Sequence, residues 1–209
     1  MKIPKAISDL INQFERLPGI GPKTAQRLTF YLLHVPQPVL DEFAAALINL
    51  KKNTVQCSEC QNVAEADPCP ICSDSSRRRD LIMVVEHPLD VLVIERAAAF
   101  DGVYHVLHGI LSPLDNIGPD DLYIKELLAR LQHGTIREII LGLNPTMEAE
   151  ATSLYIKNQI SNIKNMASTR SSINELTITR LGQGMPTGGD LQYADDSTLR
   201  QALEGRKEY

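Results

Sequence analysis

Four cysteines stand in two closely spaced pairs, and they are the only cysteines of the chain. Cys57-Ser58-Glu59-Cys60 is followed, after eight residues, by Cys69-Pro70-Ile71-Cys72. Two Cys-x-x-Cys pairs this close can place four thiolates around one tetrahedral ion, and closed four-thiolate sites are how proteins use zinc structurally. The spacing therefore predicts a structural zinc site with one ion per chain. Its predicted ligands are Cys57, Cys60, Cys69 and Cys72.

Two other uses of these cysteines stay open, namely disulfide pairing and a redox-active Cys-x-x-Cys. Neither suits the surrounding sequence, which has no secretory pattern and no thioredoxin-like βαβ pattern beside the pairs. The start, Met1-Lys2-Ile3-Pro4-Lys5, leads into a mixed amphipathic pattern instead of the apolar core of a signal peptide. The sequence also lacks the roughly 18-residue apolar run of a membrane helix. We expect a cytoplasmic protein that does not associate with membranes.

Residues 7 to 33 have the pattern of a helix-hairpin-helix, in which a Gly-Ile-Gly turn joins two helices. Gly19 and Gly21 allow the positive φ or the close approach that a tight turn needs, and N–H groups opening the second helix can bind a phosphate oxygen. Lys23 and Arg27 are four residues apart and share a helix face. We predict that these four residues bind the DNA backbone without reading its sequence. The alternative is a plain αα-hairpin, in which the glycines only turn the chain and Lys23 and Arg27 are solvated surface residues.

The charge of the chain is unevenly distributed. The formal net charge is −5, yet residues 1 to 53 carry seven Lys/Arg and four Asp/Glu, which gives +3 there and −8 for the remainder. The acidic total therefore does not exclude nucleic acid as a partner, because the basic end is electrostatically separate from the rest.

A second polar group follows two predicted strands. Glu86 ends one of them, and Asn144-Pro145-Thr146-Met147-Glu148-Ala149-Glu150 follows another. Open α/β sheets bind ligands at these carboxyl ends. The arrangement resembles the Toprim fold of topoisomerases and primases, where a strand-terminal Glu and an Asp-x-Asp hold magnesium. Here Asn144 and Thr146 stand at the two aspartate positions, and an amide and a hydroxyl are poor ligands for a hard dication.

The elements that position these residues can be predicted from hydrophobic periodicity and helix breakers. The predicted helices span residues 5–15, 22–35, 38–50, 88–100, 120–132, 147–163 and 197–203. The predicted strands span residues 81–85, 104–107, 138–143 and 175–181, and residues 165–174 form a connection. Strands alternating with helices indicate an α/β class with a doubly wound parallel sheet. His87, His105 and His108 have no ligand-like spacing, so we expect them to pack or to lie at the surface.

Seven motifs in order resemble the RecR family of bacterial recombination mediators, over nearly the whole chain. They are Leu-Pro-Gly-Ile-Gly-Pro-Lys-Thr-Ala-Gln-Arg-Leu (17–28), Asp-Pro-Cys-Pro-Ile-Cys (67–72), Val-Val-Glu (84–86), Tyr-His-Val-Leu-His-Gly (104–109), Leu-Ser-Pro-Leu-Asp (111–115), Asn-Pro-Thr-Met-Glu-Ala-Glu-Ala-Thr (144–152) and Pro-Thr-Gly-Gly-Asp-Leu (186–191). The resemblance implies a helix-hairpin-helix at 1–53, a C4-type zinc finger at 54–79, a Toprim domain at 80–174 and an oligomerisation segment with a strand and a helix at 175–209.

The resemblance also implies a function. It implies a non-catalytic DNA-repair protein that forms a homo-oligomeric ring, for which we expect four copies, and binds single- and double-stranded DNA. It further implies that the ring joins the partner RecO, so that single-strand-binding protein is displaced and RecA is loaded at gaps. Matched to the family motifs, Lys23 and Arg27 would bind DNA, the four cysteines would bind zinc, and Glu86, Glu148 and Glu150 would contact RecO.

Two positions depart from the family pattern. Ala149 stands where glycine is usual, and we expect it to narrow the turn beside the acidic residues. Gln183 stands where a basic residue is common, and we expect it to weaken one DNA contact. Two competing functions stay open. One is a magnesium-dependent Toprim nuclease or primase-like enzyme, and the other is a zinc-stabilised scaffold whose Lys23 and Arg27 are folded against acidic neighbours.

Overall fold

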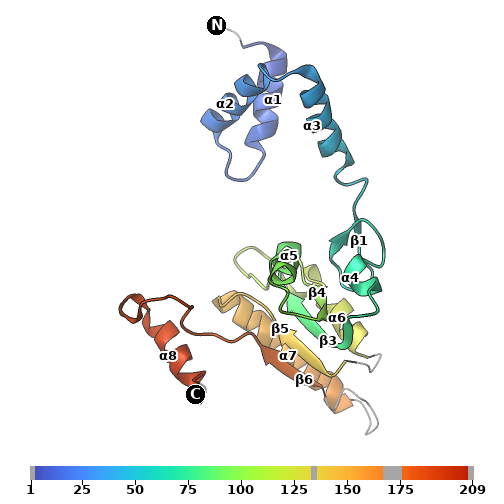
Figure 1. Ribbon diagram of the computed structural model, residues 1–209, viewed down its shortest axis with the longest axis vertical. Coiled ribbons are helices and arrows are strands. Elements are labelled where there is room, and N and C mark those ends of the chain that lie inside the picture. Colours follow the sequence, from blue (N-terminus) through green and yellow to red (C-terminus); the bar gives the residue numbers. More distant parts are fainter. Residues whose placement is uncertain (1–2, 133–135, 167–175, 207–209) are drawn as a thin grey trace. The chain divides into compact units, whose positions relative to one another are not determined.

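The computed structural model describes residues 3–132, 136–166 and 176–206 (Figure 1). Most of the predicted connection at 165–174, from residue 167 onward, lies outside the described residues. Glu175, the predicted first residue of the last strand, also lies outside them. The chain divides into two compact units, Met1–Thr54 and Val55–Tyr209. Within the described ranges, no helix has the length and apolar content needed to cross a membrane.

The first unit consists of three helices, α1 (Lys5–Glu15), α2 (Pro22–Leu32) and α3 (Gln37–Asn49). The predicted ranges are confirmed to within one residue except for the end of α2, which lies three residues before the predicted one. Helices α1 and α2 pack against each other and bury Ile11 and Ala25. Thr29 is also buried, and its hydroxyl donates to the carbonyl of Ala25 at 2.9 Å. Helix α3, in contrast, has no buried residue although it carries several large apolar side chains.

The second unit begins with a small hairpin and a short helix. Strands β1 (Val55–Gln56) and β2 (Val63–Ala64) pair in antiparallel fashion, and α4 spans Pro70–Ser73. We call residues 55–73 the cysteine knuckle, because all four cysteines lie in it.

A four-stranded parallel sheet forms the body of the second unit (Figure 1). Its strands are β3 (Arg78–Val85), β4 (Gly102–Val106), β5 (Glu138–Leu141) and β6 (Thr177–Arg180), in the order β4-β3-β5-β6. Strand β3 is central, and its successive residues from Leu81 to Val85 are all buried. A strand covered on both faces needs such a continuous apolar run, which is the pattern seen in the sequence.

Helices cover both faces of the sheet. They are α5 (Pro88–Ala97) on one face and α6 (Ile124–Leu131) with α7 (Met147–Met166) on the other. On the first face, Val91 of α5 packs with Val85 and Tyr104. On the second, Leu127 of α6 and Ile156 of α7 pack with Ile139. The predicted doubly wound α/β fold is therefore confirmed.

Several predicted boundaries were wrong by a few residues, for local reasons. Helix α6 begins at Ile124 instead of Asp120, because Pro119–Asp121 forms a separate 3-10 turn in which the Asp121 carboxylate accepts the Gly118 N–H at 2.8 Å. Helix α5 ends at Ala97, since Ala98 adopts the left-handed region with φ 49°. Strand β5 ends at Leu141, two residues before the predicted end.

The C-terminal part comprises a 3-10 turn (Leu191–Tyr193) and α8 (Asp196–Glu204), which the sequence predicted at 197–203. The Asp195 carboxylate caps α8 by accepting the N–H groups of Ser197 and Thr198, both at 2.9 Å. The loop before it packs on this helix, since a Cβ at Gly184 would lie 3.2 Å from the Cα of Ala202.

His105 lies in β4 and is completely buried, as the packing interpretation of this histidine expects. Its Nε2 lies 2.7 Å from the carbonyl oxygen of Tyr123 and must donate to it. Its Nδ1 is buried and has no hydrogen-bond partner in the described part of the chain. Burial lowers the pKa of His105 to about 4, and the nearby charge of Arg130 adds to this effect. The imidazole is therefore neutral at pH 7.

We predict that His105 makes stability fall with acidification. Its pKa rises from about 4 in the folded chain to about 6.5 on unfolding, so the unfolded state binds the extra proton between these values. The stabilisation is complete above pH 6.5 and is lost as pH falls towards 4, by roughly 3 kcal/mol in total. Urea unfolding of wild type and His105→Gln across this range measures it. The variant keeps a donor for Tyr123 and should show the shallower pH dependence, whereas equal slopes would contradict the assignment.

Candidate functional site

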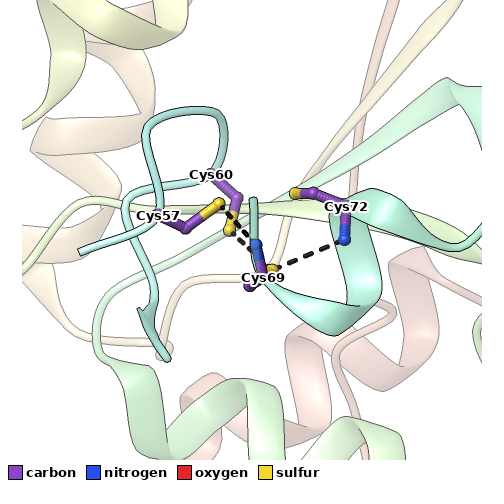
Figure 2. Close-up of side chains that lie close together, drawn as sticks. All are labelled: Cys57, Cys60, Cys69 and Cys72. Carbon is purple, nitrogen blue, oxygen red and sulfur yellow. Dashed lines mark hydrogen bonds between the residues drawn. The ribbon is translucent and has the colours of Figure 1, made fainter. Parts of the chain in front are cut away.

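The cysteine knuckle brings its four cysteines together from three places. Cys57 follows β1, Cys60 closes the first pair, and Cys69 and Cys72 lie at the N-cap and inside α4. The four side chains converge (Figure 2), and their Sγ atoms all lie within 4.8 Å of one another. All four are buried and none forms a disulfide. The disulfide alternative is therefore not what the structure shows.

Backbone N–H groups already point at the sulfur atoms. Cys69 N donates to the Sγ of Cys57 at 3.3 Å, and Cys72 N donates to the Sγ of Cys69 at 3.4 Å. The two Cys-x-x-Cys pairs are also tied together, because Ser58 donates its N–H and its hydroxyl to the Asp67 carboxylate at 2.7 and 2.9 Å. These bonds hold the sulfur atoms close together.

The thiol electrostatics show why this cluster suits a cation. A hydrogen bond from the Cys72 thiol lowers the pKa of Cys60 to about 6, while burial raises the pKa of Cys69 to about 11. The pKa of Cys72 is raised, first by its hydrogen bond to Cys60 and then by burial. The protein alone thus favours the thiolate of Cys60 and opposes the thiolates of Cys69 and Cys72. A divalent soft-metal ion would stabilise all four thiolates, so the donor set fits tetrahedral zinc.

The turn between α1 and α2 exposes the predicted phosphate-binding residues. Gly19 has φ +78°, a conformation that favours glycine, whereas Gly21 has an extended backbone and is the N-cap of α2. A Cβ at either glycine would meet nothing within 4 Å, so the backbone is open to close approach. Lys23 and Arg27 are exposed on α2, and within residues 3–54 neither forms an ion pair with an acidic side chain.

Glu86 at the end of β3 is buried, and Asn144 binds its carboxylate. The Asn144 N–H donates to one carboxylate oxygen at 2.7 Å, and the Asn144 Nδ2 donates to the other at 2.9 Å. A buried carboxylate needs such donors because it has lost its water. At this position an aspartate could not donate from its side chain, and it would add a second negative charge.

Glu148 and Glu150 lie exposed in the first turn of α7, whereas Glu86 is buried. Glu150 forms an ion pair with Arg180 of β6 at 3.2 Å. The three glutamates do not form a cluster in which ligand atoms lie within 4.8 Å of one another, and among the residues described only the cysteines do. The structure therefore places these acidic residues at the same end of the sheet without joining them in one chelating group.

Thr146 and Ala149, the other residues of this turn, have structural roles. The Thr146 hydroxyl accepts the Ala149 N–H at 3.2 Å and so caps α7. Ala149 is buried within the helix. Ala149 lies in the first turn of the helix itself, and its expected narrowing of the turn beside the acidic residues stays a prediction.

A cavity of about 340 Å³ opens beside these residues. It lies between the carboxyl ends of β5 and β6 and the C-terminal loop and α8, and Asn144, Glu150, Arg180 and Gln183 are among its lining residues. The Gln183 Oε1 is buried and has no hydrogen-bond partner within the described residues. Its expected effect on DNA binding stays a prediction.

The fold and these sites define a protein with a helix-hairpin-helix, a four-cysteine zinc finger and a Toprim-type sheet. Family models match its consecutive parts, described as the helix-hairpin-helix of RecR (7–51), the four-cysteine zinc finger domain of RecR (54–74), a Toprim domain (80–170) and the C-terminal part of RecR (184–207). The "Recombination protein RecR" of Pelotomaculum thermopropionicum is 50% identical over 204 residues, covering 98% of this chain and 96% of that relative. The chain belongs to the RecR family.

Three contacts at these sites were not predicted from the sequence. The Glu86–Asn144 pair, the Glu150–Arg180 ion pair and the Ser58–Asp67 bonds join residues that are 58, 30 and 9 positions apart. The first two depend on the strand order of the sheet, which carries no local signal. The Ser58–Asp67 bonds have no local signal either, because an Asx turn would join Asp67 to the backbone two residues further on and not to Ser58.

We predict that Asn144→Asp destabilises the protein unless magnesium is supplied. The aspartate loses the Nδ2 donor and faces the buried Glu86 carboxylate, which should lower the free energy of unfolding by about 2 kcal/mol at pH 7. Urea unfolding with and without Mg²⁺ tests this, because a cation between two carboxylates would restore part of the loss. Asn144→Ala is the control, and Mg²⁺ should not help it. An Asn144→Asp variant as stable as wild type without Mg²⁺ would refute this interpretation.

Proposed function

We propose that this chain is a non-catalytic, DNA-binding recombination mediator of DNA repair. The observation that carries the proposal is the Glu86–Asn144 pair, in which an amide binds the carboxylate where a Toprim enzyme would hold a metal ion. The three glutamates also do not form one group of metal ligands in the described part of the chain, which supports the same conclusion. Membership of the RecR family supports the role in recombination, since the relative is named a recombination protein.

DNA binding is assigned to the turn between α1 and α2. Lys23 and Arg27 contact phosphates on single- or double-stranded DNA, and the exposed backbone at Gly19 and Gly21 admits a phosphate to the start of α2. None of these residues presents a side chain arranged to read a base pair, so the contact is nonspecific. Their exposure without acidic partners in the described part of the first unit argues against the alternative of a scaffold lacking DNA affinity.

The acidic end of the sheet is assigned to docking of a RecO-like partner, through Glu86, Glu148 and Glu150. Glu148 and Glu150 are exposed and can attract a basic surface, whereas Glu86 is buried and supports the backbone beside them. With that partner, the protein displaces single-strand-binding protein and loads RecA at gaps.

Assembly into a ring of four copies is assigned to the two ends of the chain. Helix α3 has no buried residue, and an uncovered apolar helix needs a partner. Its exposed apolar side chains are Val39, Phe43, Leu47 and Ile48. In the C-terminal segment, Leu191 and Leu203 are likewise exposed. Repetition around a ring raises the effective concentration of weak DNA contacts. In this assembly each part of the chain has one role. DNA binding belongs to residues 1–53, zinc binding to 54–79, partner docking to 80–174 and oligomerisation to 175–209.

Zinc is assigned to the cysteine knuckle at one ion per chain, with Cys57, Cys60, Cys69 and Cys72 as its ligands. The ion supplies positive charge that stabilises four thiolates, and the protein residues leave no ligand position for water. Free cysteines used in this way fit a reducing compartment, so we place the protein in the cytoplasm.

We predict that freshly purified, reduced protein contains one zinc per chain and that Cys69→Ser lowers both zinc content and stability. Loss of one thiolate opens the site and removes metal-binding free energy that contributes to folding. Elemental analysis with thermal unfolding measures both quantities. Ser75→Ala changes an exposed residue of the same region and serves as the control. Protein without zinc, or a Cys69→Ser variant of unchanged stability, would exclude the site.

We predict that Lys23→Ala with Arg27→Ala weakens DNA binding equally on unrelated sequences. The slope of the logarithm of affinity against the logarithm of salt concentration should fall by about one for each lost phosphate contact. Fluorescence anisotropy across salt concentrations measures this, after light scattering has shown the same oligomer for every protein. Lys51→Ala with Lys52→Ala removes the same charge from exposed residues after α3 and should lose less affinity. Loss confined to one DNA sequence, or an equal loss in the control, would contradict the assignment.

We predict that Glu150→Lys weakens binding of a RecO-like partner, most strongly at low salt, while DNA binding by the chain alone survives or improves. The exposed Glu150–Arg180 pair contributes little to stability, so the reversal should report on docking instead of folding. Calorimetric titration of the partner at two ionic strengths provides the measurement. Glu65→Lys makes the same charge change on an exposed loop of the knuckle and should bind as wild type does. Unchanged partner affinity of Glu150→Lys would remove this surface from docking.

A further inference from the structure

Residues 106 to 109, at the end of β4, are bonded alternately to the cysteine knuckle and to the end of β3. The four hydrogen bonds are Val106 N to Cys60 O (2.8 Å), Leu107 N to Val85 O (2.9 Å), His108 Nε2 to Gln61 O (2.6 Å) and Gly109 N to Glu86 O (3.0 Å). Val106 and His108 thus bond to the knuckle, whereas Leu107 and Gly109 bond to the last residue of β3 and to Glu86, which follows it. This segment is a continuous connection between a zinc ligand and the acidic end of the sheet.

His108 is the side chain in this connection, and its conformation is unusual. His108 and Gln61 both have φ 62°, in the left-handed region that residues with a Cβ seldom adopt. Such conformations persist only where surrounding contacts impose them. The two residues meet directly, and because a carbonyl can only accept, the His108 Nε2 must donate to it. The His108 ring also packs edge-to-face against Tyr123, with ring centres 5.2 Å apart.

The backbone of Glu86 depends on the same segment. Gly109 N donates to the Glu86 carbonyl, and the Glu86 carboxylate accepts both donors of Asn144. A shift of Gln61 would therefore move His108 and Gly109, and with them the backbone that orients the buried carboxylate. Gln61 follows Cys60 directly, so an ion that fixes Cys60 also fixes the Gln61 carbonyl.

We propose that His108 is a positioning residue that couples zinc binding in the knuckle to the geometry of Glu86 and Asn144. Zinc orders the Cys60 and Gln61 carbonyls, these order residues 106–109, and the ordered segment fixes the end of β3. The coupling is reciprocal, so an intact His108 contact also strengthens zinc binding. Its consequence for partner docking rests on the function proposed above, whereas the coupling itself does not.

Two substitutions of His108 separate its hydrogen bond from its packing. His108→Phe keeps an aromatic ring against Tyr123 and loses the donor, while His108→Gln keeps a donor and loses the ring. Tyr123→Phe is the matched control, because it removes a different tie between body and knuckle, the 3.2 Å bond from the Tyr123 hydroxyl to Gln56. All three are made in the full chain. Zinc affinity is measured by competition with a chromogenic chelator, and backbone order by hydrogen–deuterium exchange with mass spectrometry.

The expected results are specific to the donor. His108→Phe should bind zinc about fivefold more weakly, the factor that corresponds to one hydrogen bond of ordinary net strength, and should exchange faster over residues 106–110. His108→Gln should stay within about twofold of wild type, in keeping with retained hydrogen bonding. Tyr123→Phe should leave exchange over 106–110 unchanged. Removing zinc from wild type should speed exchange over 106–110 more than over β5.

Three outcomes would overturn the proposal. They are unchanged zinc affinity and exchange in His108→Phe, an equal loss in His108→Gln, and a zinc-free wild type that exchanges no faster over 106–110. The last measurement needs no variant, so it decides the question even if His108→Phe fails to fold. Binding of the RecO-like partner is measured separately. If the coupling appears but wild type binds no RecO-like protein, the docking function fails and the coupling stands.

Discussion

Four buried thiols lie within 4.8 Å of one another, and they cannot all ionise unless a cation joins them. This constraint organises much of the second unit, because the knuckle that contains the thiols is bonded to the sheet. Strand β4 is an edge strand, and the carbonyl of Cys60 accepts the N–H of its last residue, Val106. Edge strands with unpaired groups invite non-native pairing, so the knuckle also protects this end of the sheet. A short segment with a very small core therefore obtains stability from metal ligation and supports the strand beside it.

The acidic end of the same sheet follows the opposite principle. There a single buried carboxylate, Glu86, is satisfied by the backbone and side-chain donors of Asn144, with no cation needed. Exposed Glu150 is balanced by Arg180, and Thr146 caps α7. The chain thus combines two kinds of site. The four thiolates need a metal ion to balance their charge, whereas the N–H groups of Asn144 bind the Glu86 carboxylate in place of a metal ion. This contrast is the physical basis for assigning the zinc site to stability and the acidic end to recognition.

Local patterns predicted most of the elements but not the contacts between them. The continuous apolar run at 81–85 identified a strand buried on both faces, and proline and glycine located the end of α1 and the start of α2. The cysteine spacing was sufficient to predict a cluster, since two short pairs can close on only one ion. In contrast, the strand order β4-β3-β5-β6 and the Glu86–Asn144 pair depend on long-range packing, for which no neighbouring residue gives a signal. His108 was predicted to pack or to be exposed, and its bond to Gln61 joins residues 47 positions apart.

The central claim is that the chain remodels protein–DNA complexes and does not cut or copy DNA. It is tested most directly by the rate of RecA filament growth on gapped DNA coated with single-strand-binding protein. The reaction contains magnesium and a RecO-like partner, with or without this chain, and the DNA is inspected for breaks afterwards. The account predicts faster filament growth with the DNA intact. No acceleration alongside a partner that binds the chain, or magnesium-dependent DNA cleavage that disappears in Glu86→Gln, would contradict it.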